Sequence, residues 1–254
     1  MSLSTQCTNA PSVTVVVTSC DRHDLLAQTL KSFLEFNTHP VREVIIVEDG
    51  PRGMDGSLRC VLQSEPVRWV NTGRRIGQIG AIDKAYALVH TPYIFHMEDD
   101  WEFYARGFIE NSLPILEENP RCLQVWLRAH DDTNGHPIES TLFLTRGVPW
   151  RKLGFDYNPP YCGPLFWHGF AFNPGLRRLQ DYRAIGTYGE HVDFEFSQPG
   201  SAEAALSCMY KERGFYAAIL ADRSGTGYVR HIGVNRHVGA PTSLGLKDGS
   251  NFCS

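Results

Sequence analysis

Three carboxylates stand next to one another at Glu98, Asp99 and Asp100, directly after the apolar run at residues 93–97. Adjacent carboxylates repel one another, and a divalent cation neutralises such a cluster effectively. Mg²⁺ or Mn²⁺ usually takes one or two protein carboxylates and completes its coordination with water and phosphate oxygens. The cluster therefore predicts a metal site for diphosphate chemistry, with a solvated acidic turn as the alternative interpretation.

Four apolar runs in the first part of the chain have the length and β-branched content of strands that are buried on both faces. Segments with apolar residues at helical spacing separate them, and repeated βα units of this kind form a parallel sheet. Such a sheet binds its ligand beyond the carboxyl ends of its strands. The predicted strands are residues 13–18, 43–48, 67–70 and 93–97, and the polar residues that follow them include Thr18, Arg22, Glu48, Asp49, Arg75 and the acidic cluster.

Several ligand classes are excluded by simple features of the sequence. The loop after the first predicted strand (TSCDRHD, residues 18–24) has no glycine, so it matches neither the dinucleotide-binding fingerprint nor a P-loop. The net charge is −4 and no long basic run occurs, so nucleic acid is not an expected partner. None of the 7 cysteines forms a CxxC pair, which argues against a zinc ribbon. A small or anionic ligand remains.

Beyond residue 101 the predicted strands and helices no longer alternate regularly. The spacing predicts helices at residues 108–118 and 201–212, and strands at residues 123–129, 141–145 and 215–220. Residues 150–174 have no clear period, and the tail from residue 224 is rich in glycine and is expected to be irregular. Because no repeat and no linker-like tract occurs, we predict a single α/β domain spanning residues 1–254.

Four sequence segments in this order resemble the nucleotide-sugar-binding half of family-two glycosyltransferases with the GT-A fold. They are VTVVVTSCDR, EVIIVEDG, NTGRRIGQIGAIDKAYA and YIFHMEDDWEF, and together they cover about the first 105 residues. The resemblance implies a Rossmann-like, mostly parallel central sheet flanked by helices, with a smaller mixed half on the acceptor side. Residues of about 12–104 would bind the nucleotide sugar, and residues of about 105–254 would bind the acceptor and supply a C-terminal lid.

The resemblance also implies roles for the residues at the strand ends. Thr18, Glu48 and Asp49 would contact the nucleoside, while Arg22 and Arg75 join them as nucleotide-binding candidates. Asp99 would meet the ribose or the water ligands of the metal. Asp100, with Glu98 as a neighbouring candidate, would bind the Mn²⁺ or Mg²⁺ that bridges the diphosphate.

The chain departs from the family pattern at two places. Family members usually carry Arg-Asn where this chain has Ile82 and Asp83, so Arg74 or Arg75 would have to supply the cation that faces the phosphates. The metal motif has the form Glu-Asp-Asp, a variant of the DXD motif that is similar to that of some N-acetylglucosaminyltransferases. Transfer of a hexosyl or N-acetylhexosaminyl group is therefore expected.

An inverting sugar transfer needs a base that deprotonates the acceptor hydroxyl. In family-two enzymes the base belongs to a Glu-Asp pair at a helix start, and the nearest match here is YGEHVD at residues 188–193. The candidates are Asp193, Glu190 and His191, and a capped surface turn is the alternative interpretation.

The glycine-rich segment VRHIGVNRHVG could cover the diphosphate as a flexible lid. His231 is a candidate metal ligand, with His237 a weaker one, although a single histidine is more often a surface or core residue. Arg230 and Arg236 are candidate diphosphate contacts. A group of aromatic residues could form a platform for the acceptor sugar or could equally belong to the core. Its members are Trp150, Tyr157, Tyr161, Phe166, Trp167 and Phe170.

These observations predict a metal-dependent glycosyltransferase that moves a sugar from a nucleoside diphosphate, expected to be UDP, to a glycan, a lipid-linked acceptor or another hydroxyl. Inversion of configuration is expected. A sugar nucleotidyltransferase and a non-catalytic nucleotide-sugar-binding module are the alternatives. No apolar run is long enough to cross a bilayer and the N-terminus lacks the features of a secretion signal, so a cytoplasmic location, free or peripheral to the membrane, is expected.

Overall fold

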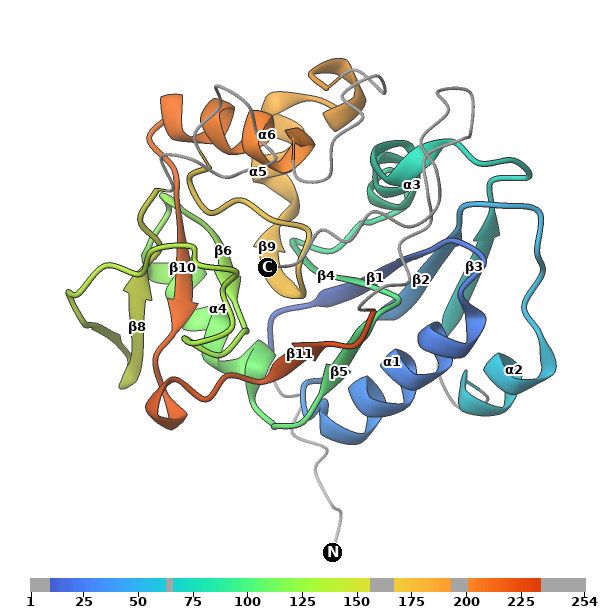
Figure 1. Cartoon of the computed structure of the whole chain (residues 1–254), viewed down its shortest axis with the longest axis horizontal. Coiled ribbons are helices and arrows are strands. Elements are labelled where there is room, and N and C mark those ends of the chain that lie inside the picture. Colours follow the sequence, from blue (N-terminus) through green and yellow to red (C-terminus); the bar gives the residue numbers. More distant parts are fainter. Residues whose placement is uncertain (1–9, 63–65, 156–166, 193–200, 234–254) are drawn as a thin grey trace, which may run out of the picture.

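The computed structural model describes residues 10–62, 66–155, 167–192 and 201–233. Within these ranges a nine-stranded sheet runs through the molecule in the order β3-β2-β1-β4-β9-β6-β10-β8-β7 (Figure 1). The first four strands in the chain are parallel to one another. They are β1 (Val13–Ser19), β2 (Glu43–Glu48), β3 (Val67–Asn71) and β4 (Tyr93–Glu98).

β1 is the centre of this parallel group. All seven of its residues are buried, as expected for a β-branched strand that is covered on both faces. In its register with the neighbouring strands, Thr18 lies opposite Glu98 and Ser19 lies opposite Glu48. The carboxyl ends of β1, β2 and β4 therefore meet at one edge of the sheet, which confirms the predicted α/β fold with a mostly parallel sheet.

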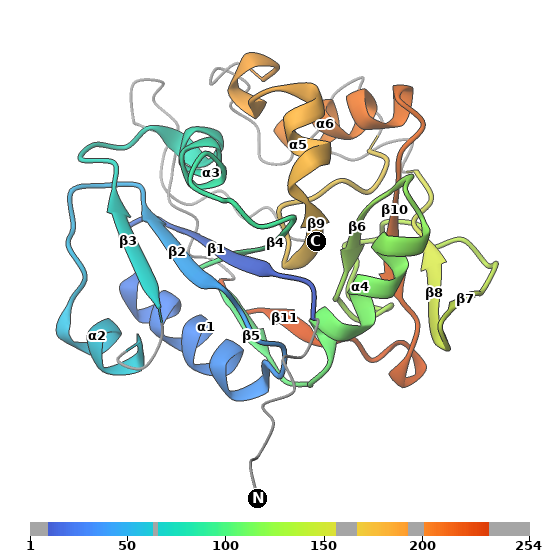
Figure 2. The same ribbon diagram turned by 180° about the vertical axis from the view of Figure 1, so that it is seen from behind.

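Helices cover both faces of the sheet, as Figures 1 and 2 show. Three helices share an apolar core with Val13, Val15 and Val17 on one face. They are α1 (His23–Phe36), α2 (Gly56–Leu62) and α4 (Phe108–Glu118). The core of the other face contains residues of α3 (Gly77–Tyr86), α5 (Leu179–Ile185), α6 (Ser201–Glu212) and the 3-10 helix η1 (Tyr188–Glu190).

β9 (Gly175–Arg178) joins the two halves of the sheet, because it pairs antiparallel with β4 on one side and with β6 (Cys122–Trp126) on the other. β6 therefore runs in the same direction as β4, and β10 (Tyr216–Leu220) runs parallel to β6. The antiparallel strands β8 (Val148–Lys152) and β7 (Phe143–Thr145) complete that edge. The carboxyl ends of β6 and β10 thus lie on the same edge of the sheet as those of β1 and β4.

A two-stranded ribbon brings the C-terminal part of the described chain back to the acidic cluster. β5 (Trp101–Phe103) pairs with β11 (Val229–His231), which places His231 opposite Trp101, and the amide of Ile232 donates to the carbonyl of Asp100 over 2.8 Å. A short 3-10 helix, η2 (Arg223–Gly225), precedes β11. The expectation of an irregular chain after residue 224 was wrong here, because a three-residue strand is too short to give a period-2 pattern.

The predicted helices at 108–118 and 201–212 match α4 and α6, whereas β5, β8, β9, β11 and α5 were not predicted. β8 begins two residues before the tract at residues 150–174, in which the sequence shows no clear period. No helix in the described ranges is long and apolar enough to cross a bilayer.

The close approach of β9 to β6 leads to a first prediction. A Cβ atom on Gly175 would lie 2.6 Å from the carbonyl oxygen of Val125, so Gly175→Ala should force the two strands apart and lower the free energy of unfolding by about 1–3 kcal/mol. Urea unfolding would measure this. Gly53→Ala is the matched control, because nothing lies within 4 Å of a Cβ at that position. Equal losses in both variants would contradict the proposed crowding at β9.

Candidate active site

The three carboxylates at the end of β4 point to different neighbours. Glu98 accepts a hydrogen bond from the Gln78 amide nitrogen over 2.5 Å and one from the Trp101 indole over 3.4 Å. Asp99 is completely buried and Asp100 is 5% exposed. The predicted cluster therefore forms one acidic site at the edge of the sheet, but its members are held by separate parts of the chain.

Arg22, immediately before α1, supplies a positive charge to two of these carboxylates. Its Nη1 lies 2.8 Å from Asp100 Oδ2 and its Nε lies 3.2 Å from Asp99 Oδ2, while Nη2 pairs with the other Asp99 oxygen. Burial opposes the charge of Arg22, but Asp99 and Asp100 together raise the pKa of its guanidinium above the ordinary value. A fork of N–H donors is well suited to hold two carboxylates at once.

The pKa values of the three carboxyl groups differ because their surroundings differ. Burial raises the pKa of Asp99 to about 6, although Arg22 opposes the shift. Burial also disfavours the ionised form of Asp100, but the hydrogen bond from His231 and the charge of Arg22 outweigh it and hold that pKa below its usual value. Burial, together with the nearby charges of Asp100 and Glu203, raises the pKa of Glu98 well above its usual value.

Asp100 and His231 have the geometry of a partial metal site. Nε2 of His231 lies 3.2 Å from Asp100 Oδ2, and Asp100 Oδ1 is buried without a hydrogen-bond partner. Two such donors fit Mn²⁺ or Mg²⁺ if water and phosphate supply the remaining ligands. Within the described ranges no three His, Cys, Asp or Glu side chains come together as metal ligands. Glu98 accepts hydrogen bonds from Gln78 and Trp101.

Glu48 and Asp49, at the end of β2, bind groups of the chain itself. Glu48 is fully buried, and its Oε1 accepts a hydrogen bond from the amide of Asp21 over 2.7 Å. The Asp49 carboxylate accepts hydrogen bonds from the amides of Ile76 and Gly77 over 2.7 and 2.8 Å, at the start of α3. A carboxylate at this position satisfies free N–H groups and interacts favourably with the helix dipole.

The other nucleotide-binding candidates lie around the same edge. Thr18 is 7% exposed and lies opposite Glu98 in the β1–β4 register. Arg75 is partly exposed, and its Nη2 lies 3.1 Å from Asp21 Oδ2. The structure therefore brings Thr18, Arg22, Asp99, Asp100 and His231 to one region, with Arg75 in the loop that precedes α3.

The candidates for the base in the second half are placed only in part. Glu190 and His191 are exposed, and their contacts lie within their own segment. Glu190 lies against Gly186, and the His191 ring contacts the carbonyl of Ile185. Asp193 lies outside the described residues, as do His237, Arg236, Tyr157, Tyr161 and Phe166.

Glu203, which its sequence context does not distinguish, is a carboxylate of the second half whose charge acts on Glu98. It lies in the first turn of α6, and its Oε1 accepts a hydrogen bond from the amide of Phe172 over 2.6 Å. Burial raises its pKa to about 7, and its charge contributes to the raised pKa of Glu98. In the sequence it resembles any acidic residue in the first turn of a helix, so only its raised pKa and its effect on Glu98 distinguish it.

The aromatic residues that could have formed an acceptor platform belong to the core wherever they are described. Trp150, Trp167 and Phe170 are 2%, 5% and 1% exposed. Arg177 is buried beside them, with its guanidinium carbon 5.6 Å from the centre of the Phe170 ring. Its Nη2 donates to the carbonyl of Ala171 over 3.1 Å. Core packing, the second of the two interpretations, therefore holds for these three aromatic residues.

Arg230 does not accompany His231 into the acidic site. It forms an ion pair with Glu102 on the neighbouring strand and is 66% exposed, because adjacent residues of a strand point to opposite faces. Both residues line a groove of about 480 Å³ with side chains of α1. In this arrangement Arg230 is paired with Glu102 and its contact with a diphosphate stays a prediction.

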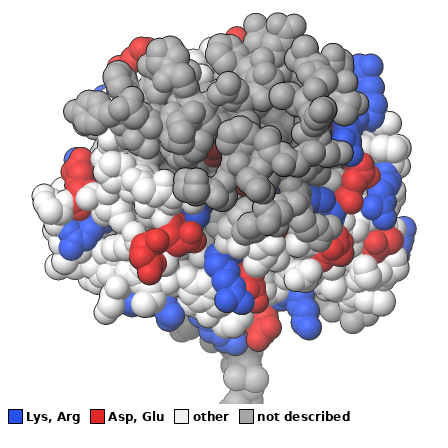
Figure 3. Space-filling view, in the orientation of Figure 1, with Lys and Arg blue, Asp and Glu red and all other residues white. Residues whose placement is uncertain are grey.

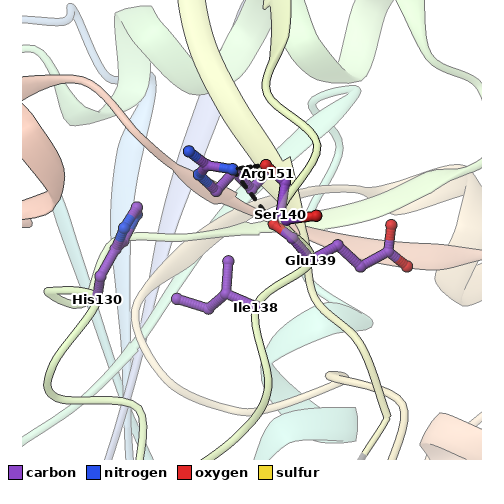
Figure 4. A pocket seen from close by; sticks show the side chains of 5 residues that line it. All are labelled: His130, Ile138, Glu139, Ser140 and Arg151. Carbon is purple, nitrogen blue, oxygen red and sulfur yellow. Dashed lines mark hydrogen bonds between the residues drawn. The ribbon is translucent and has the colours of Figure 1, made fainter.

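A second hollow of about 340 Å³ lies in the other half of the molecule (Figure 4). His130, Ile138, Glu139, Ser140 and Arg151 line it, and Arg151 donates to the backbone carbonyls of Glu139 and Ser140. On the face shown in Figure 3, acidic and basic side chains of the described residues are interspersed.

Comparison with known proteins assigns the chain to a family. The sequence model of glycosyl transferase family 2 matches residues 14–178, which is more than half of the chain, so the protein belongs to that family. The resemblance carried by the four strand-end segments therefore predicted the family correctly. No curated protein is similar enough in sequence to count as a match.

Solved structures share the fold at low sequence identity. One is the mannosyltransferase PcManGT from Pyrobaculum calidifontis, solved in complex with GDP-Man and Mn²⁺, with a TM-score of 0.54 at 16% identity. The aligned region covers 86% of this chain and 59% of the PcManGT chain. TarS from S. aureus (residues 1–349) has a TM-score of 0.55 at 13% identity, and the aligned region covers 88% of this chain and 61% of the TarS chain. A longer TarS structure has a TM-score of 0.56 at 13% identity, and the aligned region covers 86% of this chain and 36% of the longer TarS chain. The chain thus spans less than two thirds of the length of each of these proteins.

The raised pKa of Glu203 leads to a prediction about stability. Its carboxyl has a pKa of about 7 in the folded chain against an ordinary value of 4.5, so the folded state binds the proton more tightly between these two values. The stability that this proton gives is present below about pH 4.5 and is lost as the pH rises through about 7. Glu203→Gln should remove this slope, which one proton limits to about 1.4 kcal/mol per pH unit.

Urea unfolding at about pH 5, 6 and 7 would measure the slope. Glu212→Gln, at the exposed far end of the same helix, is the control and should behave like the wild type. If the pH dependence of Glu203→Gln ran parallel to that of the wild type, the raised pKa assigned to Glu203 would be wrong.

Proposed function

We propose that this protein transfers a sugar from a nucleoside-diphosphate sugar, with UDP as the expected nucleotide, to a hydroxyl of a glycan, a lipid-linked acceptor or another molecule, with inversion of configuration. The observation that supports this most directly is the unpartnered buried oxygen of Asp100 beside His231, at the strand ends where the sheet of such a fold binds its ligand. Membership in glycosyl transferase family 2 sets the reaction class. Glu98, Asp99 and Asp100 would then serve as a Glu-Asp-Asp variant of the DXD motif.

The chain's own residues would prepare the donor site. Asp100 and His231 would hold Mn²⁺ or Mg²⁺, which when bound would neutralise charge on the departing diphosphate. Arg22 fixes the orientation of Asp99 and Asp100 through its three contacts. Asp49 holds the start of α3 at the same edge. The complex of PcManGT with GDP-Man and Mn²⁺ is a precedent for a nucleotide sugar and a divalent metal on this fold.

Glu203 is the described carboxylate best suited to act as the base. A pKa of about 7 leaves a substantial ionised fraction near neutral pH while keeping the group basic enough to accept a proton. Its carboxylate would take the proton of the acceptor hydroxyl while that oxygen attacks the anomeric carbon from the side opposite the diphosphate. The bond to the diphosphate breaks as the new glycosidic bond forms. Asp193, Glu190 and His191 remain the competing candidates from the sequence.

Nucleotide binding tests the donor half of the proposal. UDP, GDP and CDP should be compared by thermal shift and calorimetry with Mn²⁺ and with EDTA, because a ligand at about 100 times its Kd stabilises the fold by about 2.7 kcal/mol. We expect one nucleotide to bind in a metal-dependent manner and Asp100→Asn to remove that dependence. Glu102→Gln, a carboxylate variant on the neighbouring strand, should leave it intact. Equal affinity with Mn²⁺ and with EDTA would refute the metal site.

Turnover tests the base. Glu203→Gln should lower kcat by about 10² to 10⁴, the usual contribution of general-base catalysis, while the Kd of the nucleotide changes little. Asp193→Asn should be measured beside it. Loss of activity in Asp193→Asn with normal activity in Glu203→Gln would move the base to Asp193. A wild-type protein that binds a nucleotide and metal but transfers sugar to no acceptor would instead be a non-catalytic binding module.

A further inference from the structure

Asp83, in the middle of α3, receives three hydrogen bonds from the second half of the chain. Its Oδ1 accepts from the amide of Tyr188 over 2.9 Å and from the hydroxyl of Tyr182 over 2.8 Å. Its Oδ2 accepts from the amide of Gly189 over 2.8 Å. The two amides belong to the first turn of η1, which the side chain of its own N-cap residue, Thr187, does not cap. The cap of η1 is therefore supplied by a helix about 100 residues earlier in the chain.

The same helix is attached to the acidic site by its first turn. Asp49 binds the amides of Ile76 and Gly77, and Gln78 donates to Glu98. α3 thus contacts the end of β2, the end of β4 and η1. Because an α-helix keeps its internal geometry, these contacts fix the distance between η1 and the acidic site.

η1 in turn contacts the groups that hold Glu203. Tyr188 is 1% exposed, and its ring centre lies 5.8 Å from that of Phe172. The amide of Phe172 donates to Glu203. The hydroxyl of Tyr210, which lies on the same helix as Glu203, is 3.5 Å from the Tyr188 hydroxyl. A displacement of Tyr188 would therefore disturb both the hydrogen bond that Glu203 accepts and the helix that carries it.

We infer that Asp83 is a positioning residue, which sets the place of Glu203 relative to the donor edge by holding η1 against α3. The inference rests on the proposed function, because it treats Glu203 as the base. It also accounts for the departure from the family at residues 82 and 83. Ile82 is fully buried in the core, so its side chain does not face a phosphate, while Asp83 binds η1 instead.

Asp83→Asn and Asp83→Ala test the inference. The amide of Asn replaces one acceptor oxygen by a donor that faces an N–H or an O–H group, and Ala removes all three hydrogen bonds. Tyr182→Phe removes only the bond from the phenol. Glu110→Gln is the matched control, because Glu110 also accepts a long-range hydrogen bond, from Thr38 over 2.7 Å, but lies on α4 at the opposite face of the sheet.

Amide hydrogen exchange provides a measurement that does not depend on activity. In Asp83→Ala, which removes both acceptor oxygens, the amides of Tyr188 and Gly189 should exchange about tenfold faster, and the amide of Phe172 should also lose protection. Glu110→Gln should change none of the three. Unchanged exchange at Tyr188 and Gly189 would show that Asp83 does not hold η1 against α3. Unchanged exchange at Phe172 alone would show that η1 does not position Glu203.

Kinetics distinguish positioning from general destabilisation. Asp83→Asn should lower kcat about tenfold while the donor KM and the nucleotide Kd change less than twofold, and Tyr182→Phe should have a smaller effect. Normal kcat together with faster exchange would overturn the positioning role. Absence of turnover in the wild type, with the exchange pattern as expected, would refute the proposed function. The attachment of η1 to α3 through Asp83 would still stand.

Discussion

The acidic cluster at the end of β4 is the constraint on which the site depends, because two of its three carboxylates are almost completely buried beside each other. Carboxylates of this kind need counter-charges and donors. The chain provides them from separate elements: Arg22 before α1, Gln78 from α3 and His231 from β11. The need to neutralise one short segment therefore draws the beginning, the middle and the end of the described chain to the same edge of the sheet.

The second half of the chain adds a different electrostatic environment. Arg177 is a buried guanidinium, and Glu203 is a carboxylate whose pKa is raised by burial even though the charges of Arg177 and Arg128 oppose the shift. The acidic site thus combines carboxylates that are held ionised, such as Asp100, with carboxylates that bind a proton more readily, such as Glu98 and Glu203. Groups with pKa values driven apart by their surroundings can divide the tasks of binding cations and moving protons.

Much of the fold was predictable because local pattern and tertiary burial agree. β2 and α4 have the predicted bounds, since an uninterrupted apolar run and a helical apolar stripe each have one good interpretation. β9 was missed because its four residues include two arginines, and only tertiary contacts explain why both are buried. The role of Asp49 as a cap for α3 and the effect of the Glu203 charge on Glu98 also depend on long-range geometry. No spacing in the sequence encodes either relation.

The antiparallel strand β9 has a consequence for the order of events during synthesis. β4 has β1 on one side, but its other edge can pair only with residues 175–178, about 80 positions later in the chain. While a ribosome makes that intervening segment, the exposed edge of β4 can pair with strands of other chains. The region matched by the family ends at residue 178, which is also the last residue of β9. The matched region therefore includes the strand that covers this edge of β4. A pause in translation before that point would lengthen the period in which the nascent protein is prone to aggregate.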